Sequence, residues 1–340
     1  MSATATALPY ADVVEAVPPD EDRQIAEIAD TIQAILQQKF RTQGKKLRDV
    51  HVKSHGCVEA EFQVLEQLPA ELSQGLFARP GIYPASMRFS NTNPVAQADC
   101  LPDGRGLAIK VREIAGEFLS PSGAPTTQDF LMANHPVFLA SNAADYLRLQ
   151  KFRWQLGQGI TAVPRAMSGV TLNPFRWLWR EGSSLAEIVT QFPKHPASYT
   201  YYSMTPFRYD DYVMKYRVQP HTGFGTRWLP EALWQPNAMR LALERSLRQQ
   251  PLAFDFQVQL RTSTTTMPIE DATREWPEAE SPYRTVARIQ VPPQELGQHH
   301  PDRGDGLAFD VWNCLPAHRP LGGINRCRRL AYRESVTWRR

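Results

Sequence analysis

The chain has 340 residues, 42% of them hydrophobic, which is enough to bury a sizeable core in one large domain or two smaller ones. Its 38 basic and 35 acidic residues give a formal net charge of +3, and this balance argues against a protein that binds nucleic acid or an acidic membrane surface. No stretch approaches the ~20 apolar residues of a membrane-spanning helix. The N-terminus also lacks the basic patch and apolar run of a secretory signal.

The four cysteines are scattered along the chain and show no CxxC spacing. They are Cys57, Cys100, Cys314 and Cys327. This pattern argues against a zinc site or a disulfide framework, so we expect reduced thiols in a cytoplasmic protein.

The first predicted elements are an arm and a helix. Residues 1–19 read as a loose arm that ends in two prolines. Asp20 or Asp22 can then cap a helix over residues 21–40, where isoleucines recur at helical spacing.

Further along, the sequence predicts strands at residues 58–64, 106–111, 252–261 and 284–291, and helices at residues 141–152 and 237–250. In the segment 252–261 apolar side chains face one way and polar side chains the other. Alternating strands, 28 prolines and separate helices favour an α+β protein with a curled antiparallel sheet. The sequence shows neither βαβ alternation nor a Gly-rich phosphate loop.

His51 lies just before the first predicted strand, beside the basic residues Arg48 and Lys53. It could act as a general base, because an imidazole pKa of ~6.5 allows proton exchange near neutrality, or it could be an ordinary structural histidine. His55 would form a metal-binding pair with it only on a helix, and the local pattern is that of a strand.

Two more polar residues interrupt apolar segments. Arg88 stands between Met87 and Phe89 and needs an anionic partner, either a protein carboxylate or a ligand carboxylate. Asn134 lies within an apolar run, so its amide is satisfied by backbone groups or it binds a ligand. Gly106, in the turn PDGRG, gives the backbone freedom between extended segments.

The last thirteen residues, RRLAYRESVTWRR, hold five arginines and Tyr332. In a helix, Arg328 four residues before the tyrosine and Arg339 seven residues after it share its face. An arginine one turn from a tyrosine can form a surface pair, or it can hold a phenolate.

Taken together, these segments resemble the haem catalase superfamily, in its short, peroxidase-like form. VHVKSHGCVEAEFQV is similar to the catalase VHAKG segment, MRFSN with PDGRGLAIKV to RFST…DPRGFAVKF, and RRLAY to RLFAY. QDFLMANHPVF resembles the segment of the distal asparagine, and IEDATREWPEAESPYRTVARIQVPP resembles the WP-containing barrel segment.

The resemblance implies an antiparallel eight-stranded β-barrel with flanking helices, a buried haem b and a C-terminal helix that ligates the haem. Residues 1–45 would form an N-terminal arm and helix, and residues 46–340 the haem-binding domain. Within that domain the barrel would cover about 46–295, and the wrapping segment with the proximal helix about 296–340.

On the proximal side, the resemblance makes Tyr332 the iron ligand and Arg328 the donor that keeps its oxygen anionic. Arg48, Arg88 and Arg339 match positions that pair with haem propionates.

On the distal side, the resemblance makes His51 the base that moves a proton between the two oxygens of a peroxide. Asn134 would hydrogen-bond the peroxide, and Ser90 would orient the ring of His51. Tyr146 falls where the family often has a phenylalanine beside the distal pocket. Val50 matches the valine of catalases, whereas relatives that dehydrate hydroperoxides have threonine there.

The chain also departs from the catalase pattern. MANHP replaces GNNTP, so an ungapped match puts Ala133 at the position of the catalytic asparagine and Asn134 one residue beyond it. The chain is shorter than classical catalases and stops eight residues after Tyr332, so we expect neither dimer-wrapping extensions nor an NADPH pocket. The segment ESVTWRR lacks the His-rich continuation of true catalases.

Three functions remain open. The first is a peroxidase that reduces hydrogen peroxide or organic hydroperoxides with a small reductant, which Val50 favours. The second is rearrangement of a fatty-acid hydroperoxide, as in allene oxide synthase, and the third is a non-catalytic haem-binding protein. This interpretation allows a homodimer, and it predicts no nucleic-acid partner.

Overall fold

The computed structural model describes residues 6–119, 126–157, 192–221, 224–296 and 306–339 of the chain. Its strands are β1 (Ser54–Val64), β2 (Gly81–Asn91), β3 (Arg105–Val111), β4 (Gln128–Ala133), β5 (Tyr201–Tyr202), β6 (Phe207–Tyr209), β7 (Tyr212–Pro220), β8 (Leu252–Leu260) and β9 (Arg284–Val291). Its longer helices within those ranges are α1 (Glu21–Gln43), α2 (Ala143–Gly157), α5 (Ala238–Gln249) and α7 (Gly323–Arg339).

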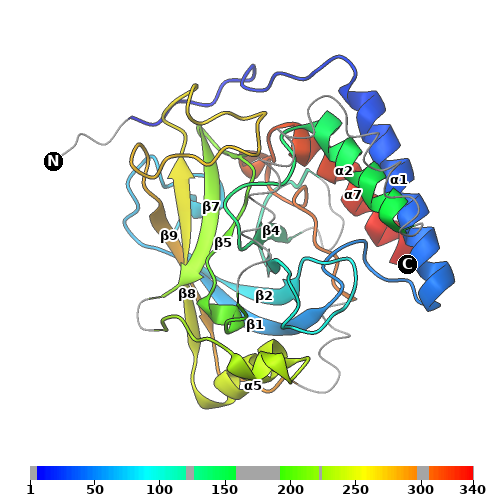
Figure 1. Ribbon diagram of the computed structural model, residues 1–340. Helices are drawn as coiled ribbons and strands as arrows, with labels where there is room; N and C mark the ends of the chain where they lie inside the picture. The colour runs from blue at the N-terminus through cyan, green and yellow to red at the C-terminus, as the bar shows by residue number, and fades with distance from the viewer. Residues whose placement is uncertain (1–5, 120–125, 158–191, 222–223, 297–305, 340) are drawn as a thin grey trace.

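The strands form one closed antiparallel barrel (Figure 1). Their order is β5-β4-β3-β2-β1-β9-β8-β7-β6, and β5 also pairs with β7 through Tyr201 and Val218. This pairing closes a ring of eight strands, while β6 lies along the same edge of β7 as β5 does. The predicted α+β class and the antiparallel eight-stranded barrel are therefore confirmed.

Each strand and helix predicted from the sequence is present, with bounds that differ by a few residues. Strands β2, β4, β5, β6 and β7 were not predicted. Asp20 is the residue that precedes α1, but its side chain makes no capping bond to the helix backbone. Its carboxylate accepts instead from Nε2 of Gln24 at 2.7 Å, so the predicted position of the cap was right and its chemistry was not.

The barrel interior is filled by aromatic rings from different strands. The rings of Phe62 on β1 and Phe130 on β4 stack with centroids 6.1 Å apart, and the ring of Phe256 on β8 lies 4.8 Å from that of Phe130. All three side chains are almost fully buried, so side chains at the other alternate positions of these strands must point out of the barrel.

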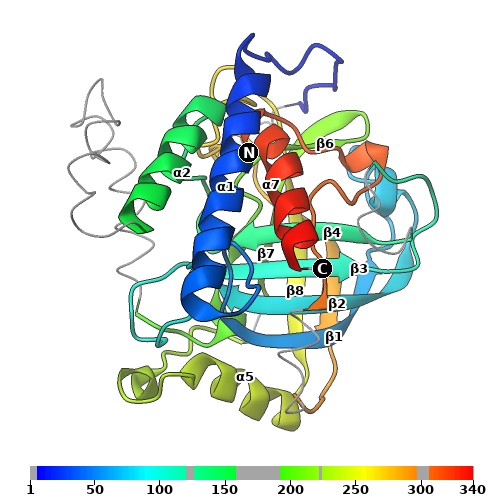
Figure 2. The ribbon, with the colours of Figure 1, turned by 90° about the vertical axis from the view of Figure 1, so that its right-hand side faces the viewer.

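The outward-pointing side chains of β2, β3 and β4 face a layer of three helices. Helices α1, α2 and α7 lie side by side in front of strands β1 to β4 (Figure 2). The three helices share an apolar cluster that includes Ile32 of α1, Leu147 of α2, and Cys327 and Ala331 of α7. Helix α7 therefore belongs to the helical layer on the side of the barrel that strands β1 to β4 form.

The prediction of a loose N-terminal arm is wrong for its described part, residues 6–19. The backbone of Leu8 donates to Arg261 at 2.8 Å and that of Tyr10 donates to Asp211 at 2.6 Å. The guanidinium of Arg208 lies 4.4 Å from the centroid of the Tyr10 ring. The arm is held because the edge of the barrel supplies backbone carbonyls that accept its N–H groups and a guanidinium that packs on the ring of Tyr10.

Candidate functional site

His51 lies in the turn before β1 and is held in an unusual backbone conformation. Its φ is 60°, in the left-handed region that residues other than glycine seldom occupy. Its N–H donates to the carbonyl of Thr92 at 3.2 Å, and its carbonyl accepts from Nη2 of Arg88 at 2.9 Å. Nδ1 of the ring lies 3.1 Å from Oγ of Ser90, so the predicted contact between these two residues is present.

Gly106 makes the room that the ring of His51 occupies. Ser90 on β2 and Gly106 on β3 are directly paired, and a Cβ built on Gly106 would lie 2.5 Å from Cε1 of His51 and 2.9 Å from Oγ of Ser90. No real side chain could fit there without displacing the ring. The sequence analysis gave this glycine only a role in backbone freedom and missed the steric one, although its neighbours in the RFST-like and PDGRG segments were both identified.

The electrostatic surroundings keep His51 neutral. The pKa of its imidazole is lowered to about 3, mainly by burial and then by the positive charges of Arg88, Arg48 and Arg328, in that order. His51 as a residue nevertheless retains some accessible surface. At neutral pH it is therefore an uncharged imidazole that can accept a proton from a group beside it.

His55 does not share a site with His51. Its Nε2 lies 2.7 Å from Oδ1 of Asn91, which follows Ser90 on β2 and therefore points to the other face of the strand. Within the described ranges, no group of three or more His, Cys, Asp or Glu side chains is placed to hold a metal ion.

On α7, Arg328 and Tyr332 lie on one face of the helix, as predicted from their spacing. The guanidinium carbon of Arg328 is 5.9 Å from the centroid of the Tyr332 ring. Burial raises the pKa of the Tyr332 phenol, whereas the charge of Arg328 and a hydrogen bond from it lower that pKa. Nη1 of Arg328 also bonds Oγ1 of Thr205 and Oδ1 of Asn325, both at 3.2 Å, so the guanidinium is fixed beside the phenol.

Arg48, Val50 and Tyr146 are the other predicted haem-site residues whose side chains the structure describes. Nη2 of Arg48 donates to the carbonyl of Leu307 at 2.6 Å, and Val50 is partly buried next to His51. Tyr146 on α2 packs edge-on against Phe138 with ring centroids 5.5 Å apart.

Burial raises the pKa of the Tyr146 phenol, and the charge of Tyr332 is among the weaker influences on that pKa. Since Arg328 likewise acts on the pKa of His51, side chains of α2, α7 and the barrel face lie within electrostatic range of one another. Arg339 is the last residue of α7, and its side chain lies outside the described part of the structure.

Asn134 follows the last residue of β4 and bonds the backbone of its neighbour strand. Its Oδ1 accepts from the N–H of Arg105 at 2.7 Å, and its own N–H donates to the carbonyl of Arg105 at 2.9 Å. Its side-chain oxygen is therefore satisfied by a backbone group, one of the two alternatives left open by the sequence. Ala133 pairs directly with Gly106, so these two residues point to the same face, the one that carries His51.

The chemistry of these side chains fits a dianionic haem, which Tyr332 and the nearby arginines would hold. A phenol that receives a hydrogen bond from a guanidinium suits ferric iron, because both partners favour the phenolate. Arg48, Arg88 and Arg328 create a positive field that favours a ligand with carboxylate groups. The absence of a side chain at Gly106 leaves the room that the ring of His51 occupies.

Comparison with known proteins shows the fold. No protein-family profile matches the sequence, and no curated protein matches it. Among solved structures, a fungal catalase is similar over 88% of this chain and 60% of its own, with 15% identity and a TM-score of 0.65. A bacterial catalase is similar over 97% and 64%, with 15% identity and a TM-score of 0.63, and catalase A from Saccharomyces cerevisiae over 100% and 68%, with 16% identity and a TM-score of 0.63.

The protein is thus an α+β barrel protein with the catalase fold, and the resemblance drawn from the sequence is confirmed at that level. It spans 60–68% of the length of these three catalases. Among the described helices, none is both long and apolar enough to cross a membrane. All four cysteines are free thiols.

Proposed function

We propose that the protein is a haem-dependent, catalase-like peroxidase that cleaves hydrogen peroxide or organic hydroperoxides and oxidises a small donor. The observation that carries the proposal is the arrangement of His51 over Gly106, with Ser90 bonded to its ring, together with the Tyr332–Arg328 pair of α7, whose arginine lies close enough to lower the pKa of His51. The proposal includes a cytoplasmic location and permits a homodimer.

Haem b would be held from both sides. Tyr332 would be the iron ligand, and Arg328 would stabilise its phenolate. Arg48 and Arg88, together with Arg339, are the proposed partners of the propionates. Val50 and Tyr146 would line the distal side. When bound, haem would supply the redox-active iron at which the O–O bond breaks.

His51 would move one proton during that cleavage. A neutral ring that carries its proton on Nδ1 would donate a hydrogen bond to Oγ of Ser90. Its Nε2 would then be free to accept a proton from the peroxide. The same features that keep the ring neutral make its protonated form a strong acid. His51 would therefore return the proton readily to the leaving oxygen, which departs as water or an alcohol. Asn134 is proposed to hydrogen-bond the peroxide through its amide N–H group.

One observation favours a second candidate, a haem-binding protein with little peroxide chemistry. Ala133, which has no polar group, lies on the face that carries His51, whereas the side-chain oxygen of Asn134 is bonded to Arg105. Rearrangement of a fatty-acid hydroperoxide has less support, because Val50 stands where hydroperoxide-dehydrating relatives have threonine.

The test is a spectrum of the purified protein after reconstitution with haemin, followed by addition of hydrogen peroxide, a bulky organic hydroperoxide and a reducing donor. A ferric tyrosinate-type spectrum and turnover that requires the donor support the proposal. Oxygen evolution without a donor indicates a small catalase, and donor-free consumption of a lipid hydroperoxide indicates rearrangement. A bound haem that leaves every peroxide intact supports the second candidate, and failure to bind haem contradicts the whole account.

A further inference from the structure

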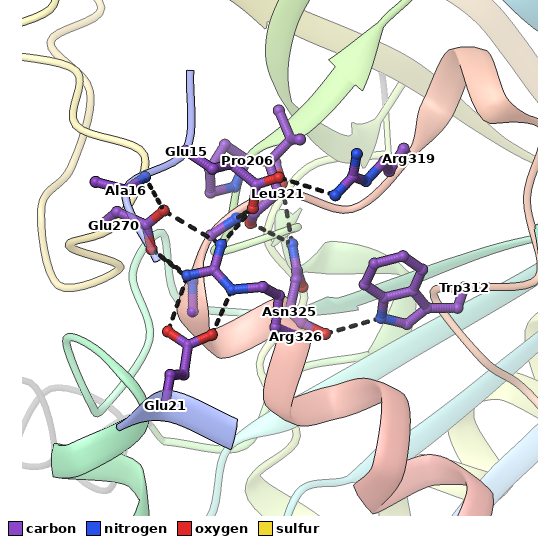
Figure 3. A network of polar contacts seen from close by, with 12 residues as sticks. Glu15, Ala16, Glu21, Pro206, Glu270, Trp312, Arg319, Leu321, Asn325 and Arg326 are labelled. Carbon is purple, nitrogen blue, oxygen red and sulfur yellow. Dashed lines mark hydrogen bonds and ion pairs between the residues drawn. The ribbon is translucent and has the colours of Figure 1, made fainter. Parts of the chain in front are cut away.

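The first turn of α7 is surrounded by three carboxylates that come from distant parts of the chain (Figure 3). Arg326 bonds Glu15 of the N-terminal arm, Glu21 of α1 and Glu270 of the segment between β8 and β9. Its Nη2 lies 2.9 Å from Oε2 of Glu21 and 2.8 Å from Oε2 of Glu270. The side chain of Arg326 is only 14% exposed, so these ion pairs are screened much less than surface pairs.

Two of the same carboxylates also bind the backbone at the start of α7. The N–H of Gly322 donates to Oε1 of Glu15 at 2.8 Å, and the N–H of Gly323 donates to Oε2 of Glu270 at 2.8 Å. The first N–H groups of a helix have no partner within the helix, and negative charge is favourable there. Glu270 is itself tied to the arm, because its Oε1 accepts from the N–H of Ala16 at 3.0 Å.

This turn leads directly to the proposed haem-binding residues. Oδ1 of Asn325 accepts from Arg328, and its Nδ2 donates to the carbonyl of Pro206 at 3.0 Å. Tyr332 follows six residues after Arg326, which is ~9 Å along the helix axis. A shift of the first turn would therefore move Tyr332 relative to the barrel face that carries His51.

Apolar packing alone does not fix that position. The face of α7 that includes Cys327 and Ala331 packs against α1 and α2, but apolar contacts are non-directional and tolerate sliding along the axis. Hydrogen bonds and ion pairs at the first turn are directional, and a guanidinium fork fixes orientation as well as distance. The carboxylate of Glu15 provides such contacts from a segment that otherwise lies along the barrel edge.

We propose that Arg326 and Glu15 are positioning residues, through which the N-terminal arm clamps the start of α7 and sets the place of Arg328 and Tyr332 at the haem. This inference rests on the proposed function, since it assigns the clamp to retention and ligation of haem rather than to folding alone. It assigns the N-terminal arm a part in the cofactor site.

The experiment uses the full chain, reconstituted with haemin, as Glu15→Gln, Arg326→Lys and the control Glu27→Gln. Glu27 on α1 is a matched control because it also bonds two basic side chains, Arg23 of α1 and Lys151 of α2, and these ion pairs do not involve α7. Three quantities are measured: the rate of haem transfer to excess apomyoglobin, the ferric absorption spectrum, and the urea midpoint of the haem-free protein.

We expect Glu15→Gln and Arg326→Lys to lose haem at least ~10-fold faster than the wild type and to shift the tyrosinate absorption bands, while Glu27→Gln does neither. Arg326→Lys keeps the positive charge but loses the forked guanidinium. A change in haem loss or in the spectrum of this variant therefore reports the loss of the guanidinium geometry.

The inference is overturned if both variants retain haem and spectrum as the wild type does. It is also overturned if their haem loss follows only a fall in the urea midpoint of the haem-free protein. A wild-type protein that takes up no haem overturns the proposed function itself.

Discussion

Replacing Gly106 by alanine tests the distal site with a single methyl group. The new Cβ would lie 2.5 Å from Cε1 of His51 and 2.9 Å from Oγ of Ser90, whereas carbon atoms in contact are normally ~3.5–4.0 Å apart. The ring of His51 must therefore move by ~1 Å. The backbone of β3 accepts alanine, because Gly106 is a strand residue without a positive φ.

A displacement of the His51 ring by ~1 Å should slow the proton transfer that this ring performs. Misplacing a reacting group by ~1 Å can lower a rate by ~10²-fold, and acid–base catalysis by a positioned side chain contributes ~10²–10⁴-fold. We therefore expect haem-loaded Gly106→Ala to cleave peroxide ~10²-fold more slowly while it keeps its haem spectrum. Overpacking should lower the free energy of unfolding by ~1–3 kcal/mol.

The control is Gly56→Ala on β1, where the new Cβ would meet only the flexible ends of Leu243 at 3.0 Å and Leu296 at 3.2 Å. Stopped-flow measurement of peroxide consumption should find the control as fast as the wild type. A Gly106→Ala protein that binds haem and cleaves peroxide at the wild-type rate would show that the ring over Gly106 is not the working base.

Four further outcomes are expected. Tyr332→Phe should abolish stable haem binding, and an unchanged spectrum in that variant would rule out the proximal assignment. Ser90→Ala should leave haem bound but slow peroxide cleavage by ~10-fold, since one orienting hydrogen bond of ~1 kcal/mol is lost from the ring of His51. Because burial lowers the pKa of His51 to about 3, the pH dependence of the cleavage rate should show no inflection between pH 5 and 8, and the rate should fall only as the pH approaches that value and the ring becomes protonated. Ala133→Asn should raise the rate of hydrogen peroxide consumption, because a second amide donor, besides that of Asn134, would then point to the face of His51; no increase would mean that this face does not contact the peroxide.

Strand β8 could be predicted because apolar and polar side chains alternate along it. In β8 the apolar side chains fill the barrel, while Gln259 on the other face donates to the carbonyls of Trp276 and Ser281. That difference produces a clear two-residue period. In β2 the apolar residues Ala85, Met87 and Phe89 also alternate with polar neighbours, and the sequence analysis missed that period. Strands β5 and β6 are too short to show one.

From the residues alone, the members of the candidate site could be recognised only as separate candidates, without the contacts between them. The charge of Arg88 and the chemistry of His51 and Tyr332 were visible in the sequence, and the resemblance to catalases put them into one site. The steric role of Gly106 depends on the neighbouring strand, and the clamp at Arg326 joins residues more than 300 positions apart. Neither contact leaves a periodic or local signal, so only the folded chain reveals them.

The register between β3 and β4 bears directly on the kind of peroxide chemistry. Directly paired residues of antiparallel strands point to the same face, so the pair of Gly106 and Ala133 puts a methyl group beside His51 where the catalase pattern has the catalytic amide. The bonds between Asn134 and Arg105 hold that register, because slipping by one residue would break both of them. In the proposed function, cleavage of one peroxide needs a mobile proton, which His51 would provide, whereas efficient dismutation also needs a second peroxide to be oriented. The register therefore favours a peroxidase that depends on an external donor over an efficient catalase.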